Sequence, residues 1–161
     1  MNIKEKFLQL AVVEQKKYEK IEEELGILRA EFSPWWNELK EERLVLTEIR
    51  DLRNRKCPDM NFEEFKEWFD SKGKVCHYCK ISQEEFNQLW DVKSEEQLTK
   101  RLRGRKLEVE RLRPNDDYTL DNMVACCYWC NNAKTDTFTE KEFLKVGKVF
   151  GEVWKARLAR L

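Results

Sequence analysis

Apolar side chains recur every three or four positions along the first 32 residues of the chain. They are Ile3, Phe7, Leu10, Tyr18, Ile21, Leu25, Leu28 and Phe32, and many of the positions between them are charged. On a helix of 3.6 residues per turn this spacing draws one apolar stripe. The sequence therefore predicts a long, highly charged helix over residues 3–32.

A second helix is predicted after Ser33-Pro34, because serine is a favoured N-cap and proline fits the first helical position. Its apolar stripe consists of Leu39, Leu46, Ile49 and Leu52, and it reaches about Lys56. Together the two helices predict an N-terminal helical hairpin. We expect residues 1–57 to form a helical extension, which serves either as the dimerisation arm of a homodimer or as an α-helical cover for the core.

The pattern changes at Cys57-Pro58-Asp59, and residues 58–161 are predicted to form the second region. Three pairs read as capping boxes of helices, namely Asn61 with Glu64, Ser82 with Glu85, and Thr139 with Glu142. The first helix buries Phe62, Phe65, Trp68 and Phe69 and ends at Gly73, and the second carries Phe86, Leu89 and Trp90. The last helix is expected to turn Phe143, Val146, Phe150 and Val153 inward.

Two strands are predicted between these helices. Leu107 and Val109 alternate with polar residues, and Met123–Cys126 reads as a second strand after the turn residues Asn115-Asp116-Asp117. A helix follows the second strand. The predicted fold class is α+β, mostly α, with a strand–loop–strand–helix (ββα) core.

Two Cys-x-x-Cys pairs, Cys76–Cys79 and Cys127–Cys130, carry the most specific chemical signal. Two knuckles of this spacing place four thiolates around one structural zinc ion. Cys126 is expected to point away from the site, because successive residues of a strand face opposite sides. The alternative is a set of disulfides or unpaired thiols, which a reducing compartment disfavours.

Composition and charge limit the location and the partners. No apolar run approaches the roughly 18 to 20 residues of a membrane span, and the N-terminus lacks a signal-peptide core, so we expect a cytoplasmic chain without membrane contact. The formal net charge is zero, so any phosphate-facing surface must come from uneven charge distribution. Basic residues do gather before and within the first predicted strand, at Lys100, Arg101, Arg103, Arg105, Lys106, Arg111 and Arg113. They predict a nucleic-acid surface, or else form an ordinary solvated face.

Residues 60–155 resemble the HNH (ββα-metal) nuclease family. Members carry an acidic residue and His on the first strand, Asn in the loop or second strand, and Cys-x-x-Cys-His/Asn-x-x-Lys at the helix. Here Glu110-Arg111 stands at the first position, Asn122 at the second, and Asn131 and Lys134 follow the last cysteine. Arginine after the acid and asparagine after the cysteine most resemble the PacI-like restriction-enzyme branch of the family.

The resemblance implies a metal-dependent endonuclease that hydrolyses phosphodiesters of double-stranded DNA, in a restriction, phage or mobile-element setting. Glu110 and Asn131 would hold Mg²⁺ or Mn²⁺, and Arg111 would contact the scissile phosphate. Asn122 would order the loop and the strand end. The DNA contacts would come from Lys134, at a flanking phosphate, and from Arg113, Arg105, Lys106 and Arg103.

The chain departs from the family at the general base. Arg111 stays protonated and cannot take a proton from water, and the only histidine, His77, lies inside the first knuckle. Water activation by His77, by Tyr78, Tyr118 or Tyr128, or by the metal alone therefore stays open. Two other functions also stay open, a catalytically silent DNA- or protein-binding module and an RNA-cleaving toxin. Joint retention of the acid, Asn122, Asn131 and Lys134 favours the nuclease.

Overall fold

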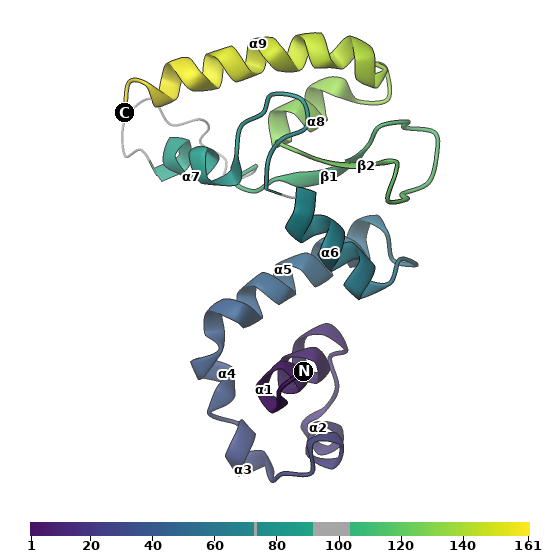
Figure 1. The fold of residues 1–161 in the computed structure, drawn as a ribbon, viewed down its shortest axis with the longest axis vertical. Helices are drawn as coiled ribbons and strands as arrows, with labels where there is room; N and C mark the ends of the chain where they lie inside the picture. Colours follow the sequence, from purple (N-terminus) through teal and green to yellow (C-terminus); the bar gives the residue numbers. More distant parts are fainter. Residues whose placement is uncertain (73, 92–103) are drawn as a thin grey trace. The chain divides into compact units, whose positions relative to one another are not determined.

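A computed structural model describes residues 1–72, 74–91 and 104–161, in two compact units, Met1–Pro58 and Asp59–Leu161. The predicted helix end at Gly73 and the predicted phosphate contact Arg103 lie outside the described residues. Each unit has a hydrophobic cluster of its own. Figure 1 shows the helices and strands of both units.

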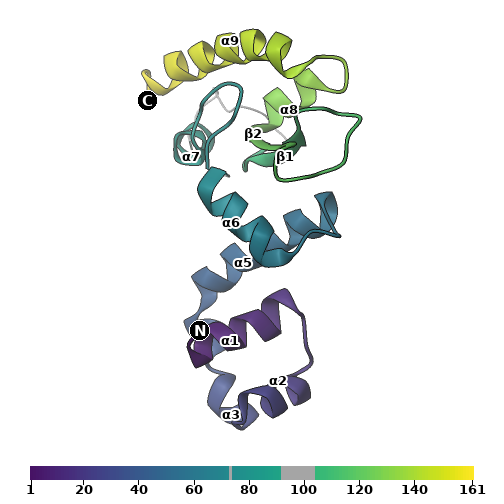
Figure 2. The ribbon, with the colours of Figure 1, turned by 45° about the vertical axis from the view of Figure 1, so that its right-hand side comes forward.

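All elements described in the first unit are helices. They are α1 (Ile3–Leu8), the π-helical turn η1 (Gln9–Val13), α2 (Tyr18–Leu25), α3 (Arg29–Phe32), α4 (Trp35–Glu38) and α5 (Lys40–Lys56). Within this unit α1, α2 and α3 lie side by side, not end to end (Figure 2).

The prediction of one helix over residues 3–32, and with it the N-terminal hairpin, is wrong. The chain leaves the helical path at Gln15, where φ is 53°, and α2 ends at Gly26, where φ is 68°. A left-handed residue at this position closes a helix, and glycine adopts it without a Cβ penalty.

The same apolar positions form the core of this unit by folding onto one another. Phe7, Ile21 and Phe32 are fully buried in one cluster, and the Phe7 and Phe32 rings lie 5.5 Å apart. A single straight helix would leave its stripe without a partner. Spacing of three and four residues fits several short helices as well as one long helix, so periodicity alone does not locate the breaks.

The second predicted helix is largely confirmed, because α5 ends at Lys56 and buries Ile49 and Leu52. Leu39, with φ −96° and ψ 33°, separates it from the short α4. Ser33 does not cap the helix with its side chain; its hydroxyl donates to the carbonyl of Arg29.

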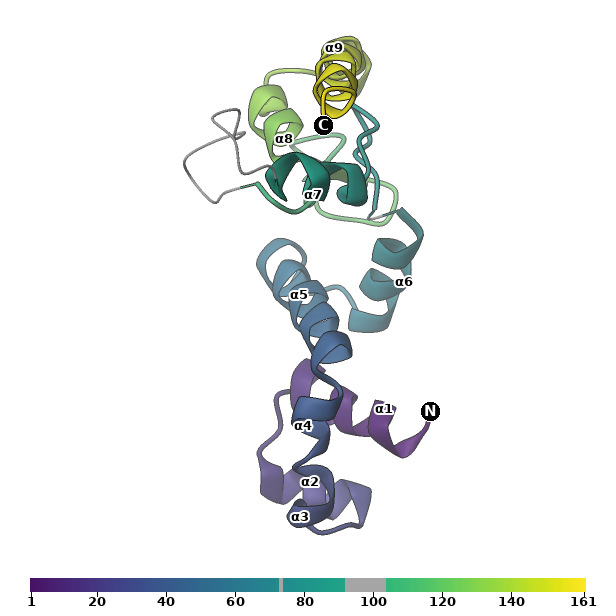
Figure 3. The same cartoon turned by 90° about the vertical axis from the view of Figure 1, so that its left-hand side faces the viewer.

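The second unit combines a two-stranded sheet with helices. It contains α6 (Phe62–Lys72), α7 (Gln83–Asp91), β1 (Glu108–Arg111), β2 (Met123–Cys126), α8 (Tyr128–Lys134) and α9 (Glu140–Leu158). The strands are antiparallel, with Glu108 opposite Cys126 and Glu110 opposite Val124. Helix α8 packs against β1, and both α7 and α8 pack against α9 (Figure 3). The α+β class is confirmed.

Side-chain caps define the helix starts as predicted. Ser82 and Glu85 exchange hydrogen bonds with each other's backbone N–H, and Thr139 and Glu142 do the same at the start of α9. Asn61 caps α6 by accepting from the backbone N–H groups of Glu63 and Glu64, which is the Asn61 half of the predicted box.

Helix α9 faces the first cysteine knuckle with two glycines. A Cβ on Gly147 would lie 2.7 Å from Cβ of Tyr78, and one on Gly151 would lie 2.5 Å from the carbonyl oxygen of Cys79. The two glycines share the buried face of α9 with Phe143, which points inward as predicted, and with Trp154. Val146 and Val153, predicted to point inward, are instead 36% and 43% exposed.

Among the described residues, no helix is both long and apolar enough to cross a membrane.

We predict that Gly151→Ala destabilises the second unit. The added methyl would overlap the Cys79 carbonyl, and overpacking of this kind costs about 1–3 kcal/mol. Urea unfolding followed by circular dichroism measures it, with the exposed α9 substitution Lys148→Ala as the control. Because alanine is the better helix former by about 1 kcal/mol, a Gly151→Ala protein more stable than the wild type would show that α9 does not pack this closely.

Candidate functional site

Four buried cysteines form a candidate metal centre. The sulfur atoms of Cys76, Cys79, Cys127 and Cys130 all lie within 4.8 Å of one another, and those of Cys79 and Cys127 are 3.7 Å apart. Sulfurs at the corners of a tetrahedron around zinc, with bonds of about 2.3 Å, are about 3.8 Å apart. The cluster can therefore hold a tetrahedral metal ion such as zinc.

Backbone hydrogen bonds shape the first knuckle. The Cys76 N–H donates to the Ile81 carbonyl at 2.9 Å, the Lys80 N–H donates to the Cys76 carbonyl at 3.0 Å, and Lys80 takes a positive φ of 61°. The His77 N–H donates to the carbonyl of Ala125 at 2.7 Å, which ties the knuckle to β2.

The second knuckle starts helix α8. Cys127 is the N-cap, and its sulfur accepts from the Cys130 N–H at 3.4 Å. Cys126 is buried but does not belong to the cluster, as the alternation of strand residues predicts. Burial raises the pKa of Cys57, outside the cluster, to about 11.

A small pocket of about 140 Å³ opens beside this centre, between β1, the following loop and α8. It is lined by Glu110, Arg111, Pro114, Tyr118, Asn131, Thr135 and Asp136. The structure thus brings together Glu110, Arg111 and Asn131, which the sequence predicts as one site. Tyr118, Thr135 and Asp136 join them.

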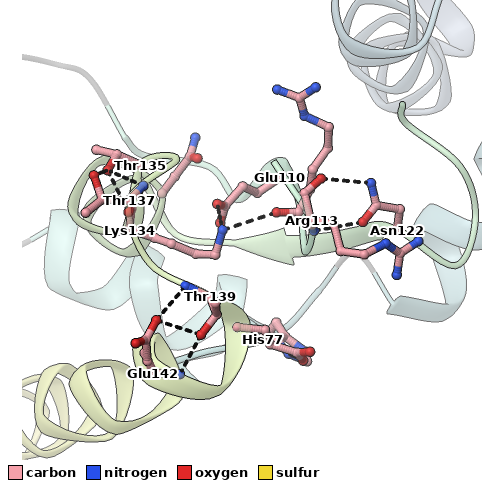
Figure 4. A network of polar contacts seen from close by, with 12 residues as sticks. His77, Glu110, Arg113, Asn122, Lys134, Thr135, Thr137, Thr139 and Glu142 are labelled. Carbon is pink, nitrogen blue, oxygen red and sulfur yellow. Dashed lines mark hydrogen bonds and ion pairs between the residues drawn. The ribbon is translucent and has the colours of Figure 1, made fainter. Parts of the chain in front are cut away.

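Glu110 is buried beside a buried cation. The Lys134 ammonium, fully buried, donates to Glu110 Oε1 at 2.9 Å and to the Arg111 carbonyl at 3.3 Å (Figure 4). Glu110 Oε2 is buried without a hydrogen-bond partner. Burial raises the Glu110 pKa, and the Lys134 ammonium opposes this shift.

The structure corrects the sequence interpretation of Lys134. A fully buried ammonium does not lie on the surface where a DNA phosphate would meet it. The position follows from the helix: α8 ends at Lys134 and packs on β1, so the side chain reaches the strand's acidic residue.

Asn131 is held by a residue that the sequence interpretation missed. Its side-chain Nδ2 donates to Glu108 Oε2. Glu108 precedes Glu110 by two residues on β1, and side chains two apart on a strand share a face. The available signal was this alternation, together with the expectation that Asn131 lies near Glu110.

Arg111 lies at the pocket with its guanidinium on a ring. It donates to the Asp116 carbonyl at 3.1 Å, and its Cζ lies 5.0 Å from the centre of the Tyr118 ring. Tyr118 is thereby the one of the four candidates for water activation that lines this pocket.

The other three candidates do not line this pocket. His77 Nε2 forms a 2.7 Å contact with Glu140 Oε1. Burial raises the Tyr78 pKa well above its ordinary value, and the Glu110 carboxylate adds to this shift. The Tyr128 ring packs edge-on against Trp129.

Asn122 braces the loop between the strands. It is fully buried; its Oδ1 accepts from the Arg113 N–H at 2.8 Å, and its Nδ2 donates to the carbonyls of Arg113 and Asp117 at 3.2 and 2.8 Å (Figure 4). These contacts are the ones that a loop-ordering residue makes.

Three of the predicted DNA contacts, Arg105, Lys106 and Arg113, are exposed. Arg113 is paired with Asp116 at 2.6 Å and with Asp121 at 3.2 Å, and Arg105 is paired with Asp91.

The fold is similar to that of a solved structure. No protein-family model and no curated protein matches. The rare-cutting HNH restriction endonuclease PacI matches with a TM-score of 0.53 and 20% sequence identity, over 73% of this chain and 81% of PacI. PacI is described as perturbing DNA. The chain therefore has an HNH-like α+β fold.

We predict that Lys134→Met destabilises the second unit by about 3–5 kcal/mol, because removing one partner strands a buried charge. Denaturant unfolding measures the change. The matched variant is Lys134→Met with Glu110→Gln, which removes both charges and should recover most of the loss. Equal midpoints for wild type and Lys134→Met would contradict a buried ion pair.

Proposed function

We propose that the chain is a metal-dependent HNH-type endonuclease that hydrolyses phosphodiester bonds of double-stranded DNA, in a restriction, phage or mobile-element setting. The observation that carries this proposal is the pocket shared by Glu110, Arg111 and Asn131, which come from a strand and the following helix. A fold similar to that of an HNH restriction endonuclease supports it.

Two kinds of metal fit the residues present. The cysteine cluster suits a structural zinc ion. Glu110 and Asn131 both line the pocket, and a carboxylate and an amide oxygen are the hard ligands that Mg²⁺ or Mn²⁺ prefers. A divalent ion bound there would supply charge stabilisation at the phosphate and a more acidic water.

The remaining residues position the substrate. Arg111 would exchange its contact with the Asp116 carbonyl for two phosphate oxygens, because a guanidinium binds phosphate with paired N–H groups. Asn122 keeps the loop around Arg113 in place. Tyr118, against Arg111, is the pocket's own candidate for orienting or activating water.

The DNA-facing surface would be formed by Arg113, Arg105 and Lys106, with Arg103 as the sequence predicts. Arg113 and Arg105 are held by aspartates that phosphates would replace. The helical unit Met1–Pro58 would act as an accessory arm, and a homodimer formed through it stays a prediction.

A catalytically silent binding module is the second candidate. It is favoured by the buried Lys134 ammonium, which already neutralises Glu110, and by the absence of histidine at the general-base position. The two candidates differ in cleavage and not in DNA binding.

The zinc proposal predicts one zinc per chain and loss of fold on chelation. Ligation of a structural zinc by thiolates is folding free energy. Elemental analysis and thermal melting test it, with Cys130→Ser against Cys57→Ser, a buried cysteine outside the cluster. Zinc-free protein that melts at the same temperature would exclude a structural zinc.

For the nuclease we predict that Arg111→Ala lowers cleavage more than DNA binding. A guanidinium at the scissile phosphate gains most as charge builds in the transition state, and removing one such donor costs about 10²–10³ in rate. A plasmid-nicking assay with Mg²⁺ or Mn²⁺, beside a gel-shift assay in EDTA, separates the two effects.

The control variants decide between the candidates. Asn131→Ala should abolish nicking, and Lys148→Ala, on the exposed side of α9, should not change it. If the wild type binds DNA but never cuts it, while Arg111→His cuts, the silent module is correct. If Arg111→Ala cuts at the wild-type rate, Arg111 is not at the scissile phosphate.

A further inference from the structure

We propose that Glu108 is a positioning residue that fixes the orientation of the Asn131 amide, so that its oxygen and not its nitrogen is presented to the pocket. This inference rests on the proposed function, in which Asn131 is a metal ligand. It concerns a residue outside the motif by which the site is recognised.

The backbone places Glu108 where it can act on Asn131. Glu108 and Glu110 share a face of β1, and α8, which carries Asn131, packs against that strand. The Asn131 N–H donates to the Cys127 carbonyl, so the residue is fixed one helical turn after Cys127 and directly after Cys130.

In the hydrogen bond between the two side chains, Asn131 must be the donor and Glu108 the acceptor. An ionised carboxylate has no donor and accepts hydrogen bonds, whereas an asparagine amide has a donating nitrogen and an accepting oxygen. Glu108 Oε2 is therefore matched by Asn131 Nδ2, as the structure shows. An amide turned by 180° would bring two oxygens together.

The orientation matters because an amide nitrogen is not a ligand for a divalent cation. Mg²⁺ and Mn²⁺ take oxygen ligands, so Asn131 can serve only with Oδ1 free. Asn131 and Glu110 line the same pocket. Glu110 is positioned by a hydrogen bond too, because the Lys134 ammonium donates to its Oε1.

The test measures Mn²⁺ binding to zinc-loaded protein by electron paramagnetic resonance, together with the Mn²⁺ dependence of plasmid nicking. Loss of a residue that orients a ligand typically weakens metal affinity about 10–100-fold. We expect this loss for Glu108→Ala, with DNA affinity in EDTA and zinc content unchanged. Glu152→Ala, at an exposed position of α9, is the matched control.

A second substitution separates orientation from a general role of Glu108. A carboxylate at position 131 has an oxygen at either end and needs no orienting partner. Asn131→Asp should therefore restore Mn²⁺ affinity to the Glu108→Ala protein. In the presence of Glu108 the same substitution should weaken binding, because the two carboxylates repel. If Glu108→Ala unfolds, Glu108→Gln, which keeps the side-chain volume and permits both amide orientations, replaces it.

The outcomes are distinct. A wild type that neither binds Mn²⁺ nor cuts DNA overturns the proposed function. A wild type that does both, with Glu108→Ala as tight as Glu152→Ala, overturns the role of Glu108 alone. Reduced nicking of Glu108→Ala at saturating Mn²⁺, by about 10² or more, would place Glu108 in the reaction itself. Failure of Asn131→Asp to restore affinity would also exclude an orienting role.

Discussion

The cysteine cluster is the constraint on which the rest of the second unit depends. It brings together Cys79 and Cys127, which are 48 residues apart in the sequence, with sulfur atoms 3.7 Å apart. Because Cys127 also caps α8, the cluster fixes where that helix begins. Asn131, which lines the pocket, and Lys134 follow within the same helix. The cysteine cluster therefore also determines where these two side chains lie. A metal in the cluster would thus act on the pocket through the helix, without touching it.

A buried ion pair lies at the pocket. Lys134 against Glu110 is a buried ion pair, and such pairs add little net stability because desolvation offsets the attraction. A core of well-packed apolar residues would stabilise the fold as well. Carboxylates with perturbed pKa values in a pocket are more often found at functional sites than at purely structural ones. The desolvation cost of burying Lys134 and Glu110 therefore favours a functional role for this ion pair over a purely structural one.

How far sequence reasoning reached depended on the range of the interaction involved. Most local signals hold: the Thr139–Glu142 cap and the strand Met123–Cys126 occur as predicted, whereas the predicted Ser33 cap does not form. The two cysteine knuckles come together as predicted, because their ligand spacing is itself a local signal. The N-terminal helix was misjudged because its breaks are required by the packing of Phe7 against Phe32, which periodicity does not encode. Burial of Lys134 and the role of Glu108 depend on how α8 meets β1, a tertiary contact that no spacing rule supplies.

In the proposed function, charge pairing limits how strongly this chain of zero net charge would bind DNA of arbitrary sequence. Non-specific affinity for DNA comes from unpaired basic charge that displaces counterions. Here Arg113 is held by Asp116 and Asp121, and Arg105 by Asp91, so part of the predicted DNA surface is neutralised before DNA arrives. Each phosphate contact would have to replace an aspartate, which reduces its net gain. Affinity would then depend on contacts that only a fitting DNA geometry completes, and binding to arbitrary DNA would be weak.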